Sequence, residues 1–201
     1  MKKLIFILPL FVFLLSGCSL SDAVSGKSEE YLISAMGFDK SEQGIEISVE
    51  AVSVNTEDTE DDKRLIIFDG SGNTAKQAFS NAEKKSTQAF DLSHCGIIAV
   101  GEGLTLKDFA EICEYCYNRD EINLSVYFVA CENAKEMLKK EPQSSVAVGY
   151  DLMSMLECQS RLSGREYKNR FYEIEAQILK KDNRYDIPFF GDGYFSDKKL
   201  W

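Results

Sequence analysis

The first third of the chain shows the alternation of hydrophobic and polar residues that is typical of β-strands. Residues 31–38 predict a short strand, and residues 45–51 alternate so that one face of a second strand is buried and the other is in water. The next two valines fall on the opposite parity, which predicts a bulge or a twist near Ala51. Residues 64–68 are rich in β-branched side chains and predict a third strand.

Helical and extended patterns alternate in the rest of the chain. Residues 75–82 carry alanines and a phenylalanine at helical spacing, which predicts an amphipathic helix, and the glycines of residues 69–73 before it predict a turn. Residues 95–100 are continuously apolar, as in a strand covered on both faces at the centre of a sheet. Thr105 and Asp108 have the spacing of a capping box, which predicts the start of another helix. The remaining segments predict a strand at 122–130 and helices at 134–140, 145–162 and 165–181.

This order of elements predicts the fold class. Strands come first, then helices and strands in alternation, then helices, which favours an α/β (α+β) domain with a mixed β-sheet and helices packed on it. The 44% hydrophobic and 28% charged residues of the 201-residue chain are typical of a folded globular protein. We therefore expect a single domain after an N-terminal leader.

The leader has the pattern of a bacterial lipoprotein signal peptide. Two lysines are followed by an apolar run over residues 4–15 and then by Leu-Ser-Gly-Cys, which ends at Cys18 and resembles a lipobox. As a helix this run would be about 18 Å long, short of the roughly 30 Å hydrocarbon core of a bilayer, which disfavours a transmembrane anchor. The pattern predicts a signal peptide over 1–17, lipidation of Cys18 and a polar tether over 18–30. An ordinary signal peptide with an unmodified cysteine is the alternative.

Charge and cysteine content narrow the possible chemistry. The net charge of −10 excludes nucleic acid as a partner, because both surfaces carry the same sign. After Cys18 five cysteines remain, an odd number that cannot all pair within one exported chain. Each lies in an apolar stretch, where a free thiol behaves as a small buried side chain. We therefore expect mostly reduced, structural thiols at Cys95, Cys113, Cys116, Cys131 and Cys158.

Candidate catalytic motifs are few. Cys113 and Cys116 form a C-x-x-C pair, but the pair lies in the last turns of its helix, where the dipole disfavours a thiolate. The single histidine, His94, could join Cys95 and this pair at a zinc site, although only one pair has ligand spacing. Acidic residues at 55–63 lack the spacing of a calcium loop and favour a solvated hairpin tip. A glycosidase-like carboxylate pair is left open, since acidic chains always offer candidates. We assign no catalytic residue, no metal site and no cofactor.

From residue 31 onward the chain resembles the Ger(x)C family, the C-subunit lipoproteins of bacterial spore germinant receptors. Residues 93–102, Ser-His-Cys-Gly-Ile-Ile-Ala-Val-Gly-Glu, are similar to the family's His-x-x-x-Ile-Ile-Ile-Gly-Glu strand and turn. The tether departs from the family, because Ser-Leu-Ser follows Cys18 in place of Trp-Asp and basic residues. The lipobox and further similar segments follow the family's order at 35–40, 71–78, 118–130, 134–138 and 187–200.

The resemblance covers only the N-terminal region of the family, which corresponds here to residues 31–201. We therefore expect the chain to lack the family's further C-terminal domains. Residues 191–200 resemble a hairpin whose turn at Asp197 and Lys198 lacks a return strand, which predicts a truncated chain.

The resemblance implies a non-enzymatic, lipid-anchored subunit of a nutrient germinant receptor complex that is needed for spore germination. It further implies a place on the outer face of the bacterial cytoplasmic membrane, which becomes the inner spore membrane, beside integral-membrane receptor subunits. Gly101 and Glu102, which end the central strand, are the candidate functional turn, and a structural turn is the alternative. The alternative function is an extracytoplasmic solute-binding lipoprotein.

Overall fold

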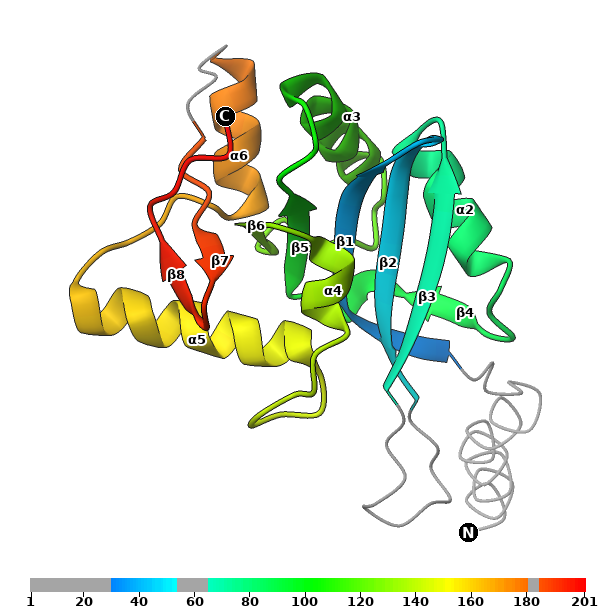
Figure 1. Cartoon of the computed structure of the whole chain (residues 1–201), viewed down its shortest axis with the longest axis horizontal. Helices are drawn as coiled ribbons and strands as arrows, with labels where there is room; N and C mark the ends of the chain where they lie inside the picture. Colours follow the sequence, from blue (N-terminus) through cyan, green and yellow to red (C-terminus); the bar gives the residue numbers. More distant parts are fainter. Residues whose placement is uncertain (1–29, 54–64, 181–184) are drawn as a thin grey trace, which may run out of the picture.

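One mixed β-sheet lies at the centre of the structure, with helices on both of its faces (Figure 1). The computed structural model describes residues 30–53, 65–180 and 185–201. The strands of this described part are β1 (Glu30–Ser41), β2 (Gly44–Val52), β3 (Leu65–Gly72), β4 (Ala89–Asp91), β5 (Ile97–Gly101), β6 (Tyr127–Cys131), β7 (Phe189–Gly191) and β8 (Tyr194–Ser196). Its α-helices are α2 (Ala75–Glu83), α3 (Leu106–Tyr117), α4 (Ala134–Leu138), α5 (Val148–Ser163) and α6 (Phe171–Leu179).

The sheet combines antiparallel and parallel pairing, as predicted. Its order is β3-β2-β1-β5-β6-β7-β8, and β4 pairs with β1 off this path. β1, β2 and β3 form an antiparallel meander, whereas β1, β5, β6 and β7 run parallel. The expected α+β domain with a mixed sheet is therefore confirmed. Within the described residues, no helix has both the length and the apolar character needed to cross a membrane.

Two hydrophobic cores lie on opposite faces of the sheet. In β5, Ile98 and Val100 face the core that is covered by α2, α3 and α6, and Ile97 and Ala99 face the core that is covered by α4 and α5. Because both faces are buried, the strand needs apolar side chains at every position. The prediction of a central strand from the continuous apolar run is confirmed.

The glycine-containing segment before α2 is the end of β3 and not a turn as predicted. β3 continues to Gly72, paired with the start of β2. A Cβ on Gly70 would lie 2.1 Å from the carbonyl oxygen of Ala78. Glycine is present here because the backbone of α2 packs directly on the strand, and not because the chain turns.

The irregularity expected near Ala51 is present, but its extra residue lies on the partner strand. Ile33 pairs with Ala51 and Ala35 pairs with Glu50, so Ser34 of β1 is additional. This shift places Ser34 Oγ against the side chain of Glu50, at 2.5 Å from Oε2. The bulge therefore turns the side chain of Ser34 toward the buried acid Glu50.

Two predicted boundaries near β6 are wrong, the first because the residues before the strand form turns, in which the amides of Ile122 and Val126 donate to carbonyls three residues earlier. The strand begins at Tyr127 and not at residue 122, and the last helix begins at Phe171 and not at residue 165. The amide of Phe128 donates to the carbonyl of Asn169 at 2.8 Å, and the amide of Phe171 donates to the carbonyl of Val126 at 2.9 Å. This pairing holds the residues before Phe171 in an extended conformation.

The C-terminal hairpin also differs from the expectation. Its turn lies at Asp192 and Gly193, which both have positive φ, and not at Asp197 and Lys198. Both of its strands, β7 and β8, are present and paired. This hairpin comes before the predicted one, whose return strand after Asp197 and Lys198 stays a prediction. After β8 the chain returns to the rest of the domain, where Trp201 packs against Phe109 with ring centroids 4.8 Å apart.

Candidate functional site at the carboxyl end of the central strands

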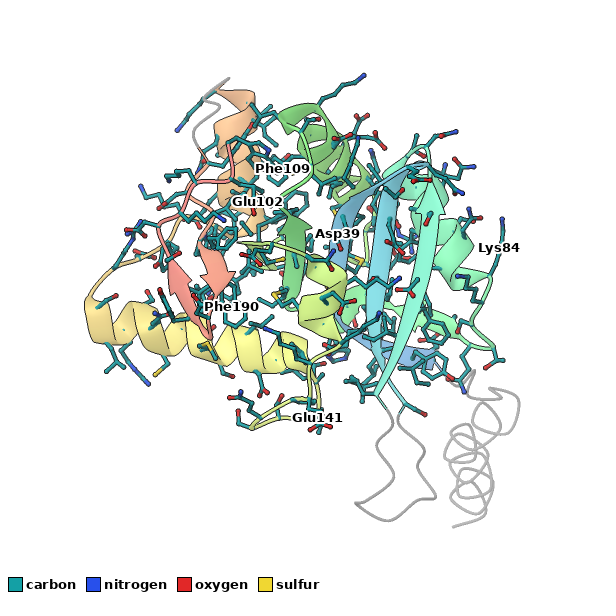
Figure 2. All side chains as sticks on the ribbon, viewed as in Figure 1. Asp39, Lys84, Glu102, Phe109, Glu141 and Phe190 are labelled. Atoms are coloured by element: carbon teal, nitrogen blue, oxygen red, sulfur yellow. The ribbon has the colours of Figure 1, made fainter. Side chains whose placement is uncertain are left out.

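The candidate turn lies at the carboxyl end of β5, beside the ends of its parallel neighbours β1 and β6. Gly101 is buried, and a Cβ on it would lie 2.0 Å from Oδ1 of Asp39, near the end of β1. Figure 2 shows Asp39 and Glu102 at this edge of the sheet. The carboxylate occupies the space that a side chain at position 101 would need, so Gly101 has a packing role.

Asp39 is a buried acid that lies in the family-like segment 35–40 and had no predicted role of its own. Its Oδ1 accepts a hydrogen bond from the amide of Ala134, and its Oδ2 accepts one from the amide of Lys135, each at 2.9 Å. These are the first two amides of α4, which have no partner within the helix. Burial raises the pKa of Asp39, and the two backbone hydrogen bonds oppose that increase. Asp39 therefore caps a helix that lies 95 residues later in the chain.

Lys135 extends this site onto the meander. Its Nζ lies 2.8 Å from an oxygen of Glu46 and 3.1 Å from an oxygen of Asp69. Asp69 in turn accepts a hydrogen bond of 2.9 Å from the hydroxyl of Ser48. The hydrogen bond to Glu46 is the main reason why the pKa of Lys135 is raised. The ammonium is thus committed to a structural ion-pair network between α4 and the sheet.

Glu102 is exposed and contacts the C-terminal segment. Its carboxylate lies 3.0 Å from Nζ of Lys198. Two residues further on, the carbonyl of Leu104 accepts a hydrogen bond of 2.8 Å from Nε1 of Trp201. The turn after β5 is therefore a contact point for residues 198–201. Of the two interpretations of Gly101 and Glu102, these contacts support the structural one.

A groove of about 670 Å³ opens next to this turn, between α4 and the C-terminal hairpin. Two lysines at its rim already stack on aromatic rings, with Lys198 Nζ 4.0 Å from the centroid of Phe189 and Lys140 Nζ 5.6 Å from that of Phe190. The groove also contains the acidic side chains of Glu132 and Glu136. It offers charges and hydrogen-bonding groups for a polar partner, but no activated nucleophile.

A second buried carboxylate, Glu50, lies on the same side of the sheet. It accepts hydrogen bonds of 2.8 Å from the amides of Val148 and Gly149, the first two residues of α5. Burial is the main cause of its raised pKa, which the hydrogen bond from Ser34 opposes. The alternation along β2 predicted that Glu50 lies on a face in water, and this prediction is wrong, because both faces of the strand are covered and Ser48 and Glu50 are fully buried.

The thiols are mostly buried, as predicted. Cys95, Cys113, Cys116 and Cys131 are buried, and none of the five described cysteines forms a disulfide. Burial raises the pKa of Cys95 to about 12 and also raises the pKa values of the other three. A raised pKa leaves little thiolate, which opposes thiol exchange at the C-x-x-C pair. Cys158 is exposed, so the expectation that it is buried is wrong.

Other candidate residues do not assemble into a site. His94 is exposed at the end of a short 3₁₀ helix, while Cys95 is buried beside it. In the described part of the chain, no group of three or more histidine, cysteine, aspartate or glutamate residues could hold a metal ion. Cys18, the signal peptide, most of the tether and the acidic segment at 55–63 lie outside the described residues.

The fold and the site define an α+β domain in which buried acids fix the ends of helices. A family model described as "Spore germination protein N-terminal domain" matches residues 28–187. The chain belongs to this family, and the Ger(x)C-type resemblance is confirmed for its N-terminal region. Membership supports a role in spore germination. No curated protein and no solved structure matches the chain significantly.

Proposed function

We propose that the protein is a lipid-anchored, non-enzymatic subunit of a nutrient germinant receptor complex, held on the outer face of the membrane beside integral-membrane subunits. The observation that carries this proposal is the family match over residues 28–187. The lipobox-like sequence that ends at Cys18 supports the anchor. Two acyl chains on this cysteine would attach the domain stably, where one chain would bind only reversibly.

The arrangement of the acidic and thiol groups supports a non-enzymatic role. Asp39 and Glu50 are each occupied by two backbone amides of a helix. The thiols of Cys113 and Cys116 are buried, with raised pKa values. These groups therefore serve packing and capping, and the exposed groove beside Glu102 offers contacts to a partner protein.

A pair of cysteine variants tests the anchor and the function together. In spores whose only copy carries Cys18→Ala, we expect the protein in the soluble fraction and a slowed loss of optical density after nutrient addition. Cys158→Ala is the matched control, because Cys158 is exposed and forms no disulfide; it should behave as wild type. Normal nutrient germination with Cys18→Ala at wild-type protein levels would contradict the proposal.

Deletion of the gene distinguishes the receptor role from the alternative, an extracytoplasmic solute-binding lipoprotein. The receptor role predicts slowed nutrient germination with normal spore formation. A solute-binding role predicts normal germination and a defect in growth on a limiting solute. Co-purification of the cross-linked protein with multi-pass membrane proteins from spore membranes would further favour the receptor role.

A further inference from the structure

The two outer strands of the sheet differ in how their free sides are covered. At one end, β8 has three residues, and the side chain of Gln159 on α5 occupies its outer side. Nε2 of Gln159 donates to the carbonyl of Phe195 at 3.3 Å, and Oε1 accepts from the amide of Phe195 at 3.0 Å. At the other end, β3 has eight residues and pairs with β2 on one side (Figure 1). The outer side of β3 is the one that could accept a further strand.

The outer side of β3 presents backbone donors and acceptors. Nδ2 of Asn81 on α2 donates to the carbonyl of Ser71 at 2.9 Å, so this carbonyl points away from β2. Because successive residues of a strand direct their N–H and C=O groups to opposite sides, the backbone groups of Ile67 and Asp69 also point away from β2. Among the described residues, none forms a hydrogen bond with these groups. They are therefore available to a partner strand.

This edge lacks the features by which proteins block the addition of a strand. Its register with β2 is continuous over eight pairs, without a bulge. Residues 65–68 are Leu-Ile-Ile-Phe, each half-buried, and β3 contains no proline and no lysine. The one charged residue of β3, Asp69, is held from the α4 side by Lys135 at 3.1 Å and by the hydroxyl of Ser48 at 2.9 Å. A long, regular and largely apolar edge is a template for a strand from another chain.

The charges at this edge favour a cationic partner over a second copy of the chain. Asp69 and Glu46 share one ammonium, that of Lys135, so that two carboxylates face one positive charge. A residue opposite Asp69 on an added antiparallel strand has its side chain on the same face, where lysine or arginine would balance this excess. Two copies would each carry a net charge of −10, and pairing centred on Ile67 would set Asp69 opposite Leu65.

We propose that β3 binds an extended segment of a partner protein, which adds to the sheet as an antiparallel strand. The segment carries lysine or arginine opposite Asp69 and apolar residues opposite Ile67 and Leu65. Main-chain hydrogen bonds to β3 provide affinity, and the side chains at alternate positions provide specificity. The inference rests on the proposed receptor role only for the source of the segment, which is an integral-membrane subunit. Peptide binding is measured without spores, so its failure is distinguishable from failure of the germination test.

A synthetic peptide tests the proposal against the full chain in a non-ionic detergent. The probe is the fluorescein-labelled peptide Thr-Lys-Thr-Val-Thr-Val-Thr, whose lysine and valines are placed to lie opposite Asp69, Ile67 and Leu65, and fluorescence polarisation measures its binding. We expect saturable binding. N-methylation of the first valine removes a donor that faces β3 and should weaken binding at least about tenfold.

N-methylation of the threonine between the valines is the matched control, because its N–H faces away from β3, and affinity should stay within about twofold of the unmethylated peptide. Absence of saturable binding, or equal affinities of the two methylated peptides, would overturn the proposal. A dimer of the full chain that the peptide dissociates in sedimentation experiments would show that a second copy occupies the edge, and would also overturn it.

A charge exchange locates the peptide on β3. Replacement of the peptide's lysine by glutamate should weaken binding to wild type about three- to tenfold. In Asp69→Asn this ratio of affinities should fall toward one, because the carboxylate that distinguishes the two peptides is gone. Asp192→Asn, in the turn between β7 and β8, is the control and should keep the wild-type ratio. A wild-type ratio in folded Asp69→Asn would place the peptide elsewhere; if this variant fails to fold, the methylated peptides decide.

Discussion

Glu50 on β2 and Gly149 in the first turn of α5 are separated by 99 residues and joined by a hydrogen bond of 2.8 Å from the Gly149 amide to Oε2. Ala147, the residue at the N-cap of α5, makes no side-chain cap of its own. Asp39 on β1 binds the first amides of α4 in the same way. The hairpin of β1 and β2 therefore supplies a carboxylate to the start of both helices on one face of the sheet, where a negative charge also complements the helix dipole.

Removal of the Glu50 carboxylate should destabilise the whole domain. Glu50→Ala leaves the amides of Val148 and Gly149 buried without an acceptor, at an expected cost of about 2–4 kcal/mol in the free energy of unfolding. Equilibrium unfolding in urea, followed by circular dichroism, measures this loss. Glu42→Ala in the exposed turn of the same hairpin is the control and should stay within about 0.5 kcal/mol of wild type. Equal stabilities of the two variants would contradict the capping role.

The titration of Glu50 should make part of the stability depend on pH. Burial raises its pKa in the native state above the ordinary value of 4.5, so the native protein binds the proton more tightly than the unfolded chain. The resulting stabilisation is fully present below pH 4.5 and is lost as the pH rises through the native pKa.

Glu50→Gln provides the test of this sign, because it cannot titrate. The free energy of unfolding of wild type minus that of Glu50→Gln should decrease as the pH rises from 4.5. Urea unfolding at a series of pH values measures the difference, which also cancels the titration of Asp39. A difference that increases over this range would show that the native pKa is lowered.

Substitution of Gly101 separates a packing role from a functional one. Gly101→Ala places a Cβ against the carboxylate of Asp39, which must move and release the amides of α4. We expect a loss of about 2–4 kcal/mol. Gly191→Ala is the matched control, because the nearest atom to its Cβ is 3.4 Å away. If Gly101→Ala is as stable as wild type but spores that carry it germinate slowly, the turn is functional and the packing interpretation is wrong.

Patterns that depend on local burial were predictable from the sequence. The run at 95–100 indicated a strand buried on both faces because every side chain there is apolar, and β5 confirms it. The capping box of Thr105 and Asp108 is present at α3 because its contacts span three residues only. By contrast, Asp39 and Glu50 cap helices that begin 95 or more residues later in the chain. No spacing along the sequence indicates which helix a distant acid will cap.

The errors have physical causes as well. Residues 165–170 have a helical pattern, but pairing of Asn169 and its neighbours with β6 keeps them extended, so a tertiary contact overrides local preference. Cys158 was expected to be buried because it follows the largely apolar stretch of residues 152–156. It lies two residues after the buried Leu156, and about 200° of helix rotation places it on the other side of α5.

The cysteines should differ sharply in reactivity. Native protein treated with iodoacetamide and analysed by mass spectrometry should be modified at Cys158, whereas Cys95, Cys113, Cys116 and Cys131 should be protected. Treatment in urea is the control and should modify all five. Rapid native modification of Cys113 or Cys116 would contradict their burial and would revive the hypothesis of a thiol enzyme.

Trp201 should hold the C-terminal segment on the turn after β5. Its Nε1 donates to the carbonyl of Leu104 at 2.8 Å, and its ring packs on Phe109. Trp201→Phe keeps an aromatic ring but removes the donor, and should cost about 0.5–1.5 kcal/mol in the free energy of unfolding. Trp201→Ala also loses the ring contact and should cost about 1–3 kcal/mol, less than for a fully buried tryptophan because 37% of the residue is exposed.

Urea unfolding followed by circular dichroism measures both Trp201 variants, since the chain contains no other tryptophan that could serve as a fluorescent probe. Tyr194→Ala is the control. This tyrosine is 53% exposed at the hairpin, so its loss should lower the free energy of unfolding by less than Trp201→Ala does. In wild type, the emission of Trp201 should shift to longer wavelength in the same urea range in which the helical signal is lost. A shift at clearly lower urea would show that the segment detaches before the domain unfolds, and that its contacts contribute little to the stability of the sheet.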